Sequence, residues 1–163
     1  MLMVKKKLYL THPNKEGFRE KLYTPLRKSG LNSQYDIILP HELDDSNYDS
    51  LSLFGREPDN LIVLAECSGH ATGRDTELAF AFLLGIPIIG FYKKGRMYST
   101  HHKTMSNAFF QYRSKDDMIS RLEVAINALQ TIPEPMKSSI DPKAWETYRD
   151  QVAQIRKYVQ EIF

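Results

Sequence analysis

The chain has 163 residues, which is enough for one domain with a substantial core and too few for two ordinary domains. Its composition, 42% hydrophobic and 26% charged, is typical of a globular protein and not of a disordered or membrane-spanning chain. The 22 basic and 20 acidic residues leave a net charge of +2, which is too balanced to predict a nucleic acid polymer or an acidic membrane as the main partner.

The beginning of the chain does not resemble a secretory signal, because the lysines at positions 5–7 follow too short an apolar stretch. No apolar segment approaches the ~18 residues that a membrane-spanning helix needs. The one cysteine, Cys67, excludes an internal disulfide and a multi-cysteine zinc site, and we expect it to be a small buried residue. The expected location is therefore the cytoplasm.

Short β-rich segments alternate with helical ones along the first part of the chain. Residues 8–10 begin a strand, and apolar residues then recur at helical spacing from about residue 15, in a helix that Pro25 must kink or divide. Residues 35–39 predict a second strand. The polar stretch 41–57 is expected to be loop, with room for one helical turn.

The second part of the chain continues the alternation. Residues 61–65 form a continuous apolar run, as in a strand covered on both faces. A helix that Gly85 ends, a strand over 86–92, a weaker strand over 109–112 and a helix over 118–129 follow. Strand and helix thus repeat about five times. This order predicts an α/β fold of the flavodoxin-like or Rossmann-like kind, a three-layer sandwich with a five-stranded parallel sheet over residues 1–130.

The end of the chain has a different composition. Residues 131–141 are rich in proline and serine and are expected to form a linker. Residues 142–163 carry an apolar stripe at helical spacing, and Asp141 followed by Pro142 is a good helix start. This C-terminal amphipathic helix either docks on the domain or meets a second subunit, and we expect a homodimer or a higher homo-oligomer.

In an open parallel sheet, ligands bind beyond the carboxyl ends of the strands where the strand order reverses. Loops 11–14 and 68–76 should meet there, and Glu77 follows the second loop at the expected beginning of its helix. The helix dipole favours an anion at that position. The carboxylate then has two interpretations: it complements the dipole, or it attacks or stabilises a cationic carbon centre.

Residues 61–90 favour the second interpretation; they read LIVLAECSGHATGRDTELAFAFLLGIPIIG. This pattern resembles the central motif of the nucleoside 2-deoxyribosyltransferase-like superfamily, and the likeness extends over residues 1–40 and 60–112. That family includes base-exchanging transferases and hydrolases of deoxynucleoside monophosphates. The resemblance implies that Glu77 is the nucleophile that takes C1′ of the sugar and that Tyr9 orients it by a hydrogen bond. It implies an enzyme of N-glycosidic bonds, with no cofactor.

The chain departs from the family pattern at two positions near Glu77. Ala71 stands where the family tends to carry Ser or Asp, which leaves Thr72, Gly73 and the loop N–H groups to hold the 5′ group. Asp75 stands where glycine is common, and it either holds a sugar hydroxyl, donates a proton or complements the helix dipole.

Further substrate contacts are expected from loops at the same edge of the sheet. Thr11 and Asn14 lie in the loop after the first strand, and His12 and His41 are candidates for binding the sugar or the base. The family resemblance also makes Asn107 a candidate for reaching the site of a neighbouring subunit. The histidines at positions 12, 41 and 70 lack the spacing of a metal site, so no metal is expected.

Two other functions remain open at this point. The loss of the family's Ser or Asp at Ala71 favours a non-catalytic domain that senses a nucleotide or an NAD derivative. A carboxylate below a ribosyl centre also suits the cleavage of NAD. In each case the partner is a small-molecule nucleoside or nucleotide.

Overall fold

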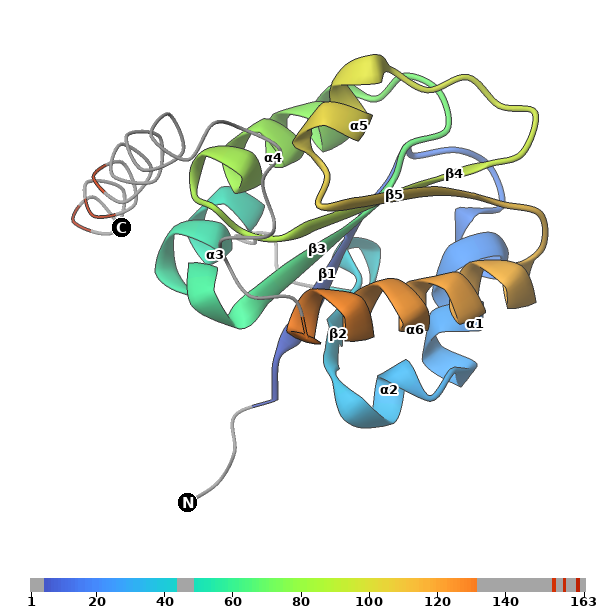
Figure 1. Cartoon of the computed structure of the whole chain (residues 1–163), viewed down its shortest axis with the longest axis horizontal. Coiled ribbons are helices and arrows are strands. Elements are labelled where there is room, and N and C mark those ends of the chain that lie inside the picture. Colours follow the sequence, from blue (N-terminus) through green and yellow to red (C-terminus); the bar gives the residue numbers. More distant parts are fainter. Residues whose placement is uncertain (1–4, 44–48, 132–153, 155–156, 158–160, 162–163) are drawn as a thin grey trace.

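The computed structural model describes residues 5–43 and 49–131, together with the single positions 154, 157 and 161. A parallel five-stranded sheet forms the middle layer, in the order β2-β1-β3-β4-β5 (Figure 1). Its strands are β1 (Lys7–Thr11), β2 (Asp36–Ile38), β3 (Leu61–Glu66), β4 (Ile88–Lys93) and β5 (Ala108–Tyr112). The predicted fold class and parallel sheet are confirmed, and the strand order reverses between β1 and β3.

Helices cover both faces of the sheet, which makes three layers (Figure 1). One layer contains α1 (Thr24–Lys28), α2 (Leu31–Gln34) and α6 (Lys115–Thr131), and the opposite layer contains α3 (Ser50–Arg56), α4 (Thr72–Leu83) and α5 (Thr100–Met105). Successive residues of β3 divide between the layers: Ile62 and Leu64 belong to the first core, and Val63 and Ala65 to the second. The continuous apolar run in the sequence reflects this double burial.

The first helical segment begins later than its apolar spacing predicts. Gly17 has a φ of 75°, which forms a turn, and a π-helical turn over Arg19–Tyr23 then leads into α1. Pro25 lies in the first turn of α1, where proline is tolerated. It therefore divides the segment, as predicted.

Three segments contain more helix than the sequence indicates. Within the polar stretch 41–57, Pro40–Glu42 forms a 3₁₀ turn and α3 follows. The Asp49 side chain caps α3 by accepting the Leu51 N–H at 3.0 Å, and Phe54 is fully buried against the sheet. A further 3₁₀ turn spans Pro58–Asn60. The short helix α5 was not predicted, and the Ser99 hydroxyl caps it.

The last described helix begins with the expected capping pair. Ser114 Oγ accepts the Asp117 N–H at 3.1 Å, while the Asp117 carboxylate accepts the N–H of Arg113 at 2.8 Å. The predicted linker over 131–141 and helix over 142–163 lie outside the described residues, except for Thr131 and the three single positions. Among the described segments, none of the helices has the length and apolar character to cross a bilayer.

Candidate active site at the carboxyl edge of the sheet

A cavity of about 420 Å³ opens beyond the carboxyl ends of β1 and β3, where the strand order reverses. The loops after β1, β2 and β3 line it, and α4 contributes one wall. Its volume falls within the range of ~300–1,000 Å³ typical of small-molecule sites. Most of the predicted site residues line this cavity: Tyr9, Thr11, His12, Asn14, His41, Thr72, Gly73 and Glu77.

Tyr9 and Glu77 meet in the cavity wall. Tyr9 Oη donates a hydrogen bond to Glu77 Oε1 at 2.8 Å, which joins the first strand to α4. The Tyr9 ring is 1% exposed and packs edge-on against Phe54, with ring centroids 5.0 Å apart. The hydroxyl is therefore held in place by the core on one side and the carboxylate on the other. The contact that the sequence resemblance implies is present.

The start of α4 differs from the prediction. The helix begins at Thr72, so Glu77 lies in its second turn and not at its first residue. The helix dipole acts mainly within the first turn, and it therefore contributes less to the carboxylate than the sequence suggested. Leu78 and Ala81 bury the inner face of α4 against the sheet, and this packing aims the neighbouring Glu77 at the cavity.

His12 is fully engaged by its own surroundings. The Pro13 carbonyl can only accept, so His12 Nδ1 donates to it at 2.8 Å and carries the proton. His12 Nε2 then accepts from the Tyr23 hydroxyl at 2.8 Å, and Tyr23 Oη receives the backbone N–H of His41 at 3.3 Å. Burial lowers the pKa of His12 and raises that of Tyr23 to about 12, which keeps both groups neutral.

This arrangement changes the predicted role of His12. Both of its ring nitrogens have protein partners, so it offers a substrate a ring surface and not a hydrogen bond. The His12 ring packs 4.7 Å from Phe18 and 5.5 Å from His41, measured between centroids. Among the described residues, none forms a hydrogen bond with a ring nitrogen of His41; the bonds of this residue involve its backbone N–H and carbonyl. His41 therefore remains a candidate for a polar contact to the ligand.

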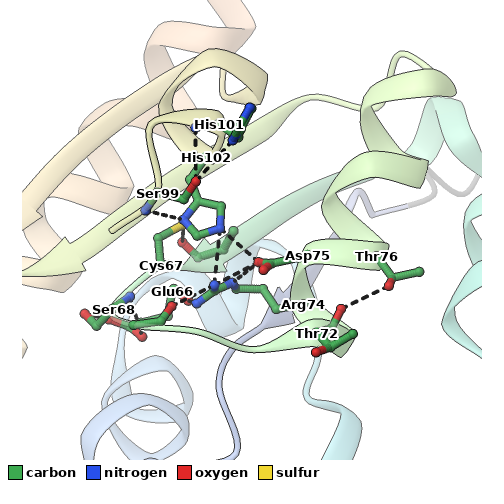
Figure 2. A network of polar contacts seen from close by, with 12 residues as sticks. Glu66, Cys67, Ser68, Thr72, Arg74, Asp75, Thr76, Ser99, His101 and His102 are labelled. Atoms are coloured by element: carbon green, nitrogen blue, oxygen red, sulfur yellow. Dashed lines mark hydrogen bonds and ion pairs between the residues drawn. The ribbon is translucent and has the colours of Figure 1, made fainter. Parts of the chain in front are cut away.

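The buried guanidinium of Arg74 braces the loop between β3 and α4 (Figure 2). Arg74 Nη1 donates to the Glu66 carbonyl at 3.1 Å, and Nη2 donates to the Gly69 carbonyl at 2.8 Å. Arg74 also pairs with Asp75 Oδ1 at 2.8 Å. Gly69 has a φ of 81°, and a Cβ there would lie 2.6 Å from Lys15 Nζ, so the loop requires glycine at this position.

His102 of α5 completes this network (Figure 2). The Ser99 N–H donates to His102 Nδ1 at 3.3 Å, so the proton of the neutral ring is on Nε2, which donates to Asp75 Oδ1 at 2.9 Å. Burial lowers the pKa of His102, although the contact with Asp75 opposes this shift. Burial alone would raise the pKa of Asp75, but the hydrogen bonds from Arg74 and His102 outweigh it and lower that pKa.

Two predicted site residues do not line the cavity. Asp75 is bound to Arg74 and His102, and this pairing is its role in the described structure. Asn107 lies immediately before β5, at the amino edge of the sheet, where its Oδ1 accepts the Ile88 N–H at 2.9 Å. Neither residue lines the cavity of its own chain. Asp75 faces α5, and Asn107 faces the amino ends of the strands.

Sequence reasoning overlooked other residues that line the cavity. Lys15 follows Asn14 directly and donates through Nζ to the Ser68 carbonyl at 2.8 Å. His70 and Arg74 also line the cavity, although the sequence suggests a metal-ligand role alone for His70 and marks no role for Arg74. The sequence does contain a signal for Arg74, because it is a long cationic residue among the small residues of the loop. Among the described residues, no three His, Cys, Asp or Glu side chains gather as a metal-binding group.

Cys67 is buried, as predicted. Burial raises the pKa of its thiol to about 12, so the thiolate is scarce at neutral pH and the residue is not an activated nucleophile.

No family model and no curated protein matches the sequence. Among solved structures, the CMP N-glycosidase BcmB of Clostridium botulinum aligns with a TM-score of 0.51 and 15% sequence identity. The alignment covers 72% of this chain and 99% of that protein. The two proteins share a fold. The predicted α/β fold, which the resemblance of residues 61–90 also implies, is therefore confirmed, and at this identity the likeness to the N-glycosidase concerns the fold alone.

Proposed function

We propose that the chain cleaves or transfers the N-glycosidic bond of a (deoxy)nucleoside or nucleotide, with Glu77 as the nucleophile. The observation that carries this proposal is the hydrogen bond from Tyr9 to Glu77 in the wall of the cavity. Support also comes from the position of that cavity at the strand reversal of an N-glycosidase-like fold.

The reaction proceeds in two displacements at C1′ of the sugar. The Glu77 carboxylate attacks C1′ through an oxocarbenium-like state while the C1′–N bond breaks, and the bonding electrons leave with the base, which takes up a proton. Water or a second base then attacks C1′ of the glycosyl ester and releases the carboxylate. Water gives hydrolysis, and a second base gives transfer.

Tyr9 determines which carboxylate oxygen reacts. Its hydroxyl occupies Oε1 of Glu77, which directs Oε2 to the sugar. Among the described residues that line the cavity, Glu77 is the one carboxylate. A proton for the departing base therefore comes from solvent or from a histidine. His41 and His70 line the cavity, whereas the Nδ1 proton of His12 is already donated to Pro13.

The first turn of α4 is suited to the 5′ side of the substrate. Ala71 provides no side-chain cap for the first N–H groups of the helix, and Ala71, Thr72 and Gly73 all line the cavity, so these N–H groups and the Thr72 hydroxyl would hold an anionic 5′ group. Thr11 and Asn14 lie across the cavity, where they would contact the sugar or the base. The resemblance assigns Asn107 to a neighbouring subunit, which requires a homodimer or a higher homo-oligomer; light scattering of the purified chain tests this.

A base-release assay tests the proposed reaction. The protein is incubated with deoxynucleosides, ribonucleosides, their monophosphates and NAD, with and without a second base, and the products are separated by chromatography. We expect release or exchange of a base that Glu77→Gln abolishes. If wild type releases no base from any substrate, or if Glu77→Gln is equally active, the proposal is wrong.

A non-catalytic sensor is the second candidate, because Ala71 leaves the loop without the hydroxyl or carboxylate that the resemblance leads one to expect. A thermal shift with a nucleotide that persists in Glu77→Gln, without turnover by wild type, would favour it over the enzyme.

A further inference from the structure

A second cavity, here called the basic pocket, lies beside the first at the carboxyl edge of the sheet. It has a volume of about 120 Å³. Four cationic side chains from two segments of the chain, 15–21 and 93–96, line it: Lys15, Lys21, Lys93 and Arg96. Its floor is formed by buried residues at the ends of β3 and β5, including Glu66, Ser68 and Tyr112.

The charges that line the basic pocket are not balanced. The four cations face two carboxyl groups, those of Glu16 and Glu66, so an excess of at least two positive charges remains. Among the described residues, none of the four cations forms an ion pair. Lys15 and Lys21 donate to the backbone carbonyls of Ser68 and Glu16, at 2.8 and 3.0 Å, which fixes the ammonium groups without neutralising them.

The simplest alternative is that the cations neutralise the buried Glu66. The hydrogen bonds of that carboxyl group argue against it. Glu66 Oε1 accepts from the hydroxyls of Ser68 and Tyr112, and Oε2 accepts the Ser68 N–H at 3.3 Å. Ser68 Oγ in turn accepts the Lys93 N–H at 2.9 Å, so its own proton is available to Glu66. Glu66 is therefore satisfied by internal donors, and the cations remain available to a ligand.

We propose that the basic pocket binds a phosphate-class dianion. The excess of positive charge matches a dianion, and an arginine with lysines is the donor set that commonly recognises phosphate. The volume is well below the ~300 Å³ at which drug-sized ligands are accommodated, so a phosphate group fits and a whole nucleoside does not. The proposal does not depend on the reaction at Glu77.

The basic pocket communicates with the larger cavity through shared residues. Pro13 and Lys15 line both. The loop after β3 is also tied to the segment that carries Arg96, because the Gly69 N–H donates to the Met97 carbonyl at 2.7 Å. The dianion is therefore either a phosphate group of a ligand that extends from the larger cavity or a separate phosphate ion.

Calorimetric titration with inorganic phosphate at constant ionic strength tests the proposal. The informative variant is Lys93→Gln combined with Arg96→Gln, since both side chains are exposed and their loss should leave the fold intact. The matched control is Lys94→Gln combined with Arg113→Gln. It removes the same charge from neighbouring exposed positions that do not line the pocket. Circular dichroism melting verifies that all proteins are folded.

We expect wild type to bind phosphate saturably. The pocket variant should weaken this binding by at least about tenfold and the control variant by less than about twofold. Charge-assisted hydrogen bonds act only at the pocket, whereas both variants reduce the long-range electrostatic field equally. Equal weakening in both variants, or no saturable binding by wild type, would overturn the proposal.

A second titration identifies the source of the dianion, with a nucleoside monophosphate and the matching nucleoside as probes. If the phosphate belongs to a ligand of the larger cavity, the pocket variant weakens binding of the monophosphate but not of the nucleoside, and inorganic phosphate competes with the monophosphate. If the phosphate is separate, the two bind together. Each result supports the pocket as a phosphate site.

Discussion

Tyr9→Phe is the most direct test of the bond that organises the cavity. The substitution removes one oxygen atom and keeps the ring that packs against Phe54. A hydrogen bond to a charged group contributes about 1.5–3 kcal/mol, and the half-buried Glu77 can recruit water from the cavity in place of the lost hydroxyl. We therefore expect the lower end of that range, about 1.5 kcal/mol, or roughly a tenfold loss of kcat/KM for base release.

The loss should appear in kcat more than in KM, because the misdirected carboxylate affects the attack on C1′ and not the binding of substrate. Tyr35→Phe is a matched control. It also removes a buried tyrosine hydroxyl that forms a hydrogen bond, here with Gln130 Nε2 at 2.8 Å on the other face of the sheet. Tyr9→Phe with the activity of wild type, or Tyr35→Phe with the same loss, would refute the reasoning.

Three further predictions concern stability and reactivity. Burial lowers the pKa of His102 below its ordinary 6.5, so the unfolded chain binds more protons and the free energy of unfolding decreases as the pH falls below about 6.5. Urea unfolding should show a shallower decrease for His102→Gln, with the exposed His101→Gln as the matched control. Gly90→Ala should lower the free energy of unfolding by about 1–3 kcal/mol, because a Cβ there would lie 2.6 Å from atoms of the Phe109 and Ser106 side chains. Gly73→Ala is the control: its Cβ would meet nothing within 4 Å, so the free energy of unfolding should not decrease. Iodoacetamide at pH 8 should leave Cys67 unmodified in the folded protein and alkylate it in urea, and rapid native labelling would contradict its burial.

The sheet could be predicted from the sequence because its signals are local. The apolar run of β3 and the turn residues that follow each strand specify a parallel α/β fold without knowledge of long-range contacts. The meeting of the loops after β1 and β3 then follows from topology alone. The pairing of Tyr9 with Glu77 required the family resemblance as well, since neither residue signals the other along the chain.

The sequence-based predictions differ from the structure where contacts between residues far apart in the sequence determine the position or role of a residue. The first turn of α4 lacks apolar residues, and its position depends on the buried Arg74, whose partners come from β3 and the following loop. The role of His12 depends on Tyr23, which a π-helical turn brings to the ring. The cations of the basic pocket come from separate segments, so no run of sequence marks them as a group.

The hydrogen bonds of Arg74 limit how the loop between β3 and α4 can vary among related chains. Its guanidinium contacts the carbonyls of Glu66 and Gly69, so it fixes the span between the end of β3 and the beginning of α4. One inserted residue would break this span or rotate the helix by about 100°, and Glu77 would then turn away from Tyr9. Substitutions at the exposed positions His70, Thr72 and Gly73 leave the span unchanged. We therefore expect relatives of this chain to vary the residues at these three exposed positions more readily than Gly69, Arg74 or the length of the loop.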